Sequence, residues 1–169
     1  PQVGGCFGMT LSARQSTNFS PLLRRMNAAA YKMALLYAFL TLLSFVFYRL
    51  AGETFLSSVV LALTSISTSG LDPRGMVLGE TGLPTELAAC ASMLLAGVNF
   101  LLWQRVAERR DLRTLFADAE LRFFLAVVLF GTLALAVYLA AVGVYDVEKS
   151  LRMGFFHAIS FATTTGFAA

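Results

Sequence analysis

The chain has 169 residues, of which 57% are hydrophobic and only 14% are charged. So few charged side chains cannot cover a water-soluble domain, and the long uncharged runs predict an all-α polytopic membrane protein. The net charge of +3 would suit a nucleic-acid partner, but the basic residues are confined to particular loops, so we expect no such partner.

Catalytic and metal-binding functions find no support in the residue pattern. Cys6 and Cys90 are far apart, no CxxC occurs, and the chain has one His, so we expect neither a disulfide framework nor a metal site. The apolar runs contain no His/Glu/Asp cluster, no Ser/Lys dyad and no nucleotide motif. We therefore expect no enzyme activity and no cofactor. The opening PQVGGCF does not resemble a signal peptide, and we expect the chain to be an internal piece of a longer protein.

The first 51 residues predict a loop and a membrane span. Residues 1–30 are polar and rich in Gly and Arg, which is typical of a cytoplasmic connection leading into the membrane. Residues 33–51 are apolar except for Arg49, which lies near enough to the end to reach the interface. At about 1.5 Å per residue, this segment just spans a hydrocarbon core of about 30 Å.

The next apolar segment, residues 54–66, is too short to cross the membrane because 13 residues of helix extend about 20 Å. Thr54 is a suitable N-cap. We predict a re-entrant pore helix, since irregular backbone at membrane depth must line a cavity or be buried in protein. An interfacial helix or an ordinary buried helix is the alternative.

The motif TSISTSGLDP begins at Thr64, and a near copy, SFATTTGFA, begins at Ser160, so the two starts differ by 96 positions. Backbone carbonyls on a short extended run, supported by Ser and Thr hydroxyls, can replace the water shell of a cation. Each run closes on a Gly, which suits the backbone angles needed to aim carbonyls at one axis. A Gly that merely ends a buried helix is the alternative, but duplication favours a repeated pore loop. The predicted filter loops are 67–71 and 163–167, with these ion-binding residues: Ser67, Thr68, Ser69, Gly70, Thr163, Thr164, Thr165 and Gly166.

A second span is predicted over residues 84–103, with Pro84 in its first turn. Gly97 and Asn99 interrupt its apolar run. A polar amide in a membrane helix normally bonds to a neighbouring helix, so we expect Asn99 to brace helices, with direct ion contact as the alternative.

The same order then begins again. A charged segment, residues 105–122, leads to a third span over 123–145, a second short helix over 151–162 and the second filter loop. His157 lies in that short helix. An ionisable group at membrane depth is a candidate functional residue, but we favour a packing or interfacial role for it.

The basic residues predict the orientation. Nine of the thirteen Lys and Arg residues precede the first span or separate the second from the third, so these loops are expected to be cytoplasmic and both filters to open outward. Six acidic residues lie on the other face. They could raise the local cation concentration or could simply be solvated: Glu53, Asp72, Glu80, Glu86, Asp146 and Glu148.

The two filter motifs, the segment AGVNF between them and DAELRFF before the third span resemble the Trk/Ktr/HKT superfamily of potassium uptake proteins, and the bacterial TrkH type most closely. Members carry four span, pore helix, filter, span units around one pore. The opening VGGCFGMTL is similar to the segment after the first unit. On that placement residues 1–30 are a connection, 31–110 the second unit and 111–169 part of the third.

The resemblance implies selective potassium permeation at the bacterial inner membrane, with potassium as substrate. It also implies a homodimer and a cytosolic nucleotide-binding regulatory subunit of the TrkA or KtrA kind. Both copies keep the filter Gly where sodium-conducting members commonly have Ser in the first unit. Ser69 and Leu71 depart from the residues frequent at these positions. A channel, a sodium- or proton-coupled symporter, a membrane enzyme and a nonconducting scaffold remain distinct readings.

Overall fold

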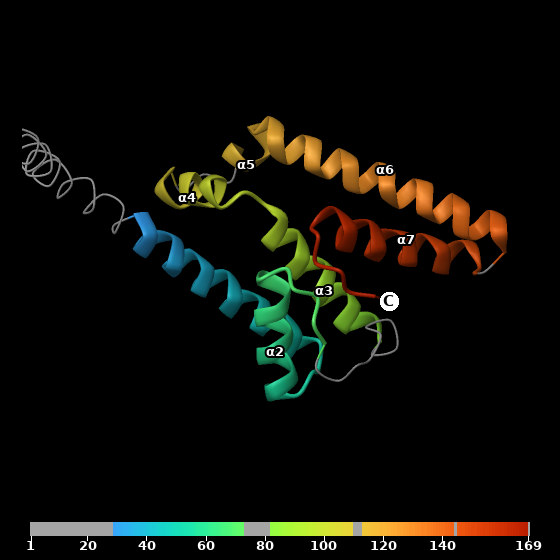
Figure 1. Cartoon of the computed structure of the whole chain (residues 1–169), viewed down its shortest axis with the longest axis horizontal. Helices are drawn as coiled ribbons and strands as arrows, with labels where there is room; N and C mark the ends of the chain where they lie inside the picture. Colours follow the sequence, from blue (N-terminus) through green and yellow to red (C-terminus); the bar gives the residue numbers. More distant parts are fainter. Residues whose placement is uncertain (1–28, 73–81, 110–112, 144, 169) are drawn as a thin grey trace, which may run out of the picture. The chain divides into compact units, whose positions relative to one another are not determined.

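The computed structural model describes residues 29–72, 82–109, 113–143 and 145–168, and within them it is helical without strands. The first helix is Ala29–Leu50. The others are α2 Phe55–Ile66, α3 Leu83–Gly97, α4 Phe100–Arg109, α5 Arg113–Ala117, α6 Ala119–Val142 and α7 Val147–Ala162 (Figure 1). The chain divides into two units, Pro1–Leu35 and Leu36–Ala169, and all packing below lies within the second. Residues 1–28 of the expected connection over 1–30 fall outside the described residues.

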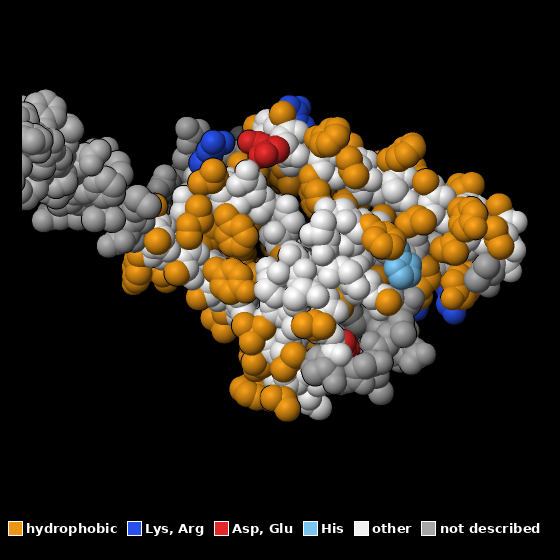
Figure 2. Space-filling model, in the orientation of Figure 1, with side chains coloured by type: hydrophobic (Ala, Val, Ile, Leu, Met, Phe, Trp, Pro, Cys, Tyr) orange, Lys and Arg blue, Asp and Glu red, His pale blue; other side chains and the backbone are white. Residues whose placement is uncertain are grey.

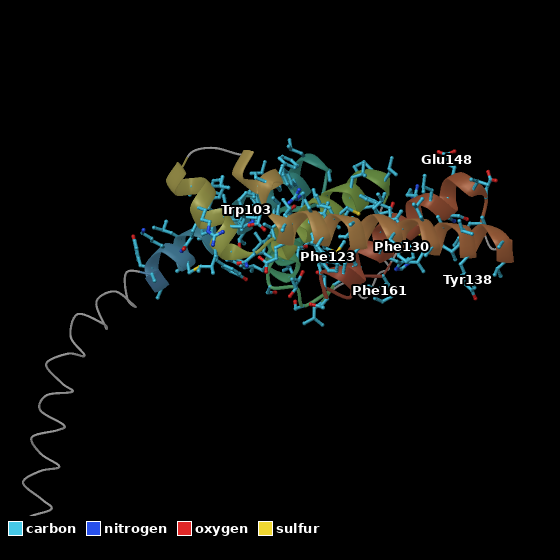
Figure 3. The ribbon with its side chains drawn as sticks, turned by 90° about the horizontal axis from the view of Figure 1, so that it is seen from above. Trp103, Phe123, Phe130, Tyr138, Glu148 and Phe161 are labelled. Carbon is cyan, nitrogen blue, oxygen red and sulfur yellow. The ribbon has the colours of Figure 1, made fainter. Side chains whose placement is uncertain are left out.

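Two of these helices are long and apolar enough to cross a membrane. The first helix has a mean hydropathy of 1.8 and α6 one of 2.5. Large apolar side chains on α6 face outward: Phe123, Phe130 and Tyr138 are 71%, 75% and 65% exposed, and Figure 3 shows them spaced along the helix. The hydrophobic side chains that cover much of the surface in Figure 2 match a protein whose outer solvent is lipid. The chain is therefore an all-α polytopic membrane protein.

Capping residues explain where the helices begin and end. α6 begins at Ala119, earlier than the expected residue 123, because the Asp118 carboxylate accepts hydrogen bonds from the backbone N–H groups of Glu120 and Leu121. It stops at Val142 because Gly143 adopts the left-handed conformation of a C-cap, with φ of 73°. α7 likewise begins at Val147 rather than 151, since Asp146 caps it. Residues of the polar segments before α6 and before α7 thus form the first turn of each of these helices.

The expected single span over residues 84–103 is instead two helices, α3 and α4, that bend by 87° at a break. Val98 is extended, and the Asn99 side chain accepts a hydrogen bond of 2.9 Å from the Leu101 N–H, which starts α4. The Trp103 indole N–H donates to the Leu95 carbonyl at 3.2 Å, so one carbonyl at the end of α3 is satisfied across the break. Gly97 and Asn99 indicated in the sequence that the apolar run is interrupted, but not that the helix bends there.

The core of this unit lies among the first helix, α2, α3 and α7. α3 contacts both α2 and α7, and α6 packs along α7. Fully buried side chains there include Tyr48, Leu61, Met93, Phe156 and Ile159. Polar pairs cross the same core at 2.7 Å, from the Ser44 hydroxyl to that of Ser92 and between the hydroxyls of Tyr48 and Ser65. Such pairs tie helices together where apolar packing against lipid gives little preference.

Candidate functional site

The two predicted filter loops follow the C-termini of α2 and α7, and their backbones are held in the same way. Each loop turns its first three N–H groups back onto carbonyls in the last turns of the preceding helix. In the first loop the bonds are Ser67 to Leu63 at 3.0 Å, Thr68 to Ser65 at 3.2 Å and Ser69 to Thr64 at 3.0 Å. In the second they are Thr163 to Ile159 at 2.9 Å, Thr164 to Phe161 at 3.0 Å and Thr165 to Ser160 at 3.0 Å. Every atom pair in one loop has its counterpart 96 residues later, so the repeat extends to hydrogen bonding.

The backbone angles of the loops also repeat. Thr68 and Thr164 have φ of 50° and 57°, and among the described residues they are the only non-glycine residues with positive φ. Each follows a right-handed residue and is followed two positions later by a left-handed glycine, Gly70 or Gly166, with φ of 63° and 83°. A right-handed residue next to a left-handed one gathers N–H groups on one side, so the carbonyls face the other. The N–H groups at the start of each loop bond to the preceding helix, which leaves the other side of the turn to the carbonyls of the same residues. The Phe167 carbonyl, at the end of the second loop, does not follow this pattern, because it bonds to Ser160 of the helix.

Side-chain hydroxyls support each loop differently. The Ser67 hydroxyl donates to that of Ser69 at 3.2 Å, whereas the hydroxyls of Thr163 and Thr165 are 2.8 Å apart and buried. The second loop is also fastened at its end, because the Ser160 hydroxyl donates to the Phe167 carbonyl at 2.8 Å.

The residues that close the loops lie in contrasting places. Phe167 is buried in the core, while Leu71, at the equivalent position of the first loop, is 68% exposed. The first loop, which has Leu71 where the second has Phe167, therefore ends on a side chain that is not buried in the core of the described residues.

The two loops lie against each other. A Cβ added to Gly70 would collide with the Thr165 carbonyl oxygen and would lie 3.0 Å from the carbonyl carbon of Gly166. Gly70 is thus required twice, by its positive φ and by the backbone of the second loop. The Gly166 position has no atom within 4 Å of such a Cβ, so only its φ favours glycine there.

The break between α3 and α4 adjoins the second loop. A Cβ on Gly97 would lie 2.8 Å from Thr163 Cγ2 and 2.9 Å from Phe124 Cζ. Asn99, two residues on, donates from Nδ2 to Glu120 Oε2 at 3.0 Å and thereby links α4 to α6. A cavity of about 170 Å³ is lined by Gly97, Val98, Asn99, Leu102, Glu120, Leu121 and Phe124. Asn99 therefore braces α4 against α6.

The last two candidate residues are His157, in α7, and Asp72. His157 is half-buried, and its ring packs against Phe156 and Phe161 of its own helix, with centroids 5.8 and 6.2 Å apart. Asp72 ends the described part of the first loop. His157 thus lies in a packing environment.

Two polar contacts, one behind the first loop and one near the starts of α3 and α7, were not identified from the sequence. Tyr48 bonds to Ser65, whose carbonyl in turn accepts the Thr68 N–H. Glu86 is paired with Arg152 across α3 and α7 at 3.1 Å. A buried Ser in the last turn of a pore helix and an acid inside a membrane helix were the available signals, but neither indicates its partner.

Comparison with known proteins supports the resemblance. The chain is 32% identical to the Trk system potassium uptake protein TrkG of Escherichia coli over 133 residues, which are 78% of this chain and 27% of TrkG. It is 29% identical to TrkI of Halomonas elongata over 96% of this chain and 33% of that protein. No family model matches the sequence.

A solved structure agrees in fold. The potassium transporter TrkH from Vibrio parahaemolyticus superimposes with a TM-score of 0.79 at 21% identity, covering 85% of this chain and 32% of TrkH. The chain thus spans about a third of the length of the proteins it matches. All of them are named as potassium transport proteins and none as an enzyme. The expected resemblance is confirmed: over most of its length the chain is similar in sequence and fold to one part of the Trk potassium uptake proteins.

Proposed function

We propose that this chain forms part of a selective pathway through which potassium enters the cell. The observation that carries the proposal is the contact of Gly70 with the Thr165 and Gly166 backbone, because it brings two carbonyl runs of equal conformation to one place. Two loops on separate surfaces could not share an ion. The relatives, named as potassium uptake proteins, support potassium as the cation.

The loops would act by replacing the water shell of the ion. Carbonyls of residues 67–70 and 163–166 would supply neutral oxygens. The N–H groups of residues 67–69 and 163–166 are already bonded to the helix ends, so this part of the backbone need not reorganise when an ion arrives. The C-termini of α2 and α7 carry partial negative charge toward the loops, which favours a cation there. The membrane potential adds about 2.3 kcal/mol per charge for each 100 mV.

The direction and assembly of the protein form part of the same proposal. The basic segments 1–32 and 105–122 are placed in the cytoplasm and both loops open outward, at the bacterial inner membrane. By family resemblance the complete protein is a homodimer with a cytosolic nucleotide-binding regulatory subunit. A sodium- or proton-coupled symporter of the same fold is the alternative, since it would use the same oxygens.

The test is rubidium uptake by the complete protein in a strain that lacks its own potassium uptake. Wild type should restore growth at low potassium, and Gly70→Asp and Gly166→Asp should each abolish uptake because a side chain and a charge enter the loop. Gly52→Asp is the matched control, since Gly52 also has positive φ but has open space around it. Failure of the wild type to restore growth, or unchanged uptake in both filter variants, would refute the proposal.

A further inference from the structure

Glu86 is a carboxylate that the fold removes from solvent. Its side chain is only 3% exposed, in the first turn of α3, and neither carboxylate oxygen accepts a hydrogen bond from the residues that the structure describes. Arg152 of α7 places Nε 3.1 Å from Glu86 Oε2. Since an unpaired buried carboxylate is strongly unfavourable, the Arg152 guanidinium is what makes this burial tolerable.

The position of the pair relates it to the second filter loop. Glu86 meets Arg152 near the starts of α3 and α7, while Gly97 meets Thr163 at their ends. Eleven residues separate the two contact points on each helix, so the helices run in the same direction and in register for about 16 Å. α7 is continuous between these points (Figure 1). α7, which leads into the second loop, is therefore held near its start by an ion pair and at its end by close packing.

We propose that Glu86 and Arg152 are positioning residues that set the depth of the second filter loop against the first and thereby contribute to cation selectivity. The inference rests on the proposed function. α3 contacts α2 as well as α7, so a slide of α7 along α3 would shift Thr163 to Gly166 relative to the first loop. Carbonyls that coordinate one ion from two loops tolerate little displacement, because the size of the ion site changes with it.

A pair that served only to hold helices together would affect how much protein reaches the membrane and nothing else. A positioning pair also changes the preference among ions in the protein that does reach it. The measurement is therefore the ratio of rubidium to sodium uptake, taken for the complete protein in cells lacking potassium uptake and normalised to the amount in the membrane.

Glu86→Gln and Arg152→Gln should each lower the rubidium to sodium ratio at least about threefold and raise the KM for rubidium more than they lower the maximal rate. Arg152→Lys, which keeps the charge, should retain most of the wild-type ratio. Glu148→Gln is the matched control, because Glu148 lies exposed in the first turn of the same helix (Figure 3). The double variant Glu86→Gln with Arg152→Gln should be no worse than either single, since all three lose the same interaction.

A single variant leaves one unpaired charge, which can prevent insertion into the membrane. The double variant removes both charges and so still allows the ion ratio to be measured. Unchanged ion ratios in the inserted variants, or losses that add in the double variant, would overturn the inference. So would absence of every charge-removing variant from the membrane, since the pair would then serve folding. A wild type without rubidium uptake would remove the proposed function itself, which is a separate result.

Discussion

At the scale of single residues, two kinds of glycine can be distinguished. Gly70 needs both a positive φ and the absence of a side chain, whereas Gly143 has a similar φ of 73° with nothing within 4 Å of an added Cβ. A substitution of Gly143 would therefore introduce backbone strain alone, whereas a substitution of Gly70 would introduce both strain and a collision. Comparing the two variants separates the two effects.

Gly70→Ala should reduce rubidium uptake per membrane-inserted protein by more than about tenfold, because strain of about 1–2 kcal/mol adds to displacement of the Thr165 carbonyl. Gly143→Ala should lower the melting temperature in detergent but leave uptake per protein near that of wild type. Equal losses of uptake in the two variants would show that the collision has no functional effect.

Tyr48→Phe tests the support of the first loop from behind. The substitution removes the hydroxyl that pairs with buried Ser65 and should lower the free energy of unfolding by about 1–3 kcal/mol. Thr41→Val is the control, because the Thr41 hydroxyl bonds only to the Tyr37 carbonyl of its own helix among the contacts described. Thermal unfolding in detergent measures both, and an equal shift would argue against a special role for the Tyr48 hydroxyl.

At the scale of elements, the sequence predicts well where the apolar helices lie and where α2 begins. Thr54 begins α2 as expected, and the apolar runs coincide with helices. The starts of α6 and α7 were placed four residues too late because the caps Asp118 and Asp146 lie in polar loops, where hydropathy alone gives no signal. The 87° break was missed because Gly97 and Asn99 show in the sequence that the apolar run is interrupted but do not give the angle between the two helices.

Asn99 has two separable roles at this break. Asn99→Asp keeps an acceptor for the Leu101 N–H but replaces the donor to Glu120 with a like charge, whereas Asn99→Ala loses both. Amide hydrogen exchange in lipid nanodiscs should be faster at the start of α4 in Asn99→Ala by about five- to thirtyfold, corresponding to about 1–2 kcal/mol of cap energy. Asn99→Asp should leave that exchange nearly unchanged while loosening the start of α6. Equal exchange in both variants would contradict a capping role.

At the scale of the whole molecule, the proposed topology can be tested by labelling. In the complete protein with Cys6 and Cys90 replaced by Ser, Glu148→Cys should react with a membrane-impermeant maleimide added outside intact cells, because Glu148 is assigned to the outer face. Arg105→Cys should react only after the cells are opened. If both cysteines were labelled from the same side, the proposed topology would be wrong, and the filters could not be assigned to the outer face.

The contact between the loops has a consequence for how such a chain can change over evolutionary time. Two repeats that had merely been duplicated would be free to drift apart, but here the backbone of one occupies the volume that any side chain at Gly70 would need. A side chain at Gly70 is admissible only if the backbone of the second loop moves, whereas the Gly166 position has open space. The constraint is therefore one-sided: the path of the second loop restricts which residues the first loop can accept, even where the rest of each repeat diverges.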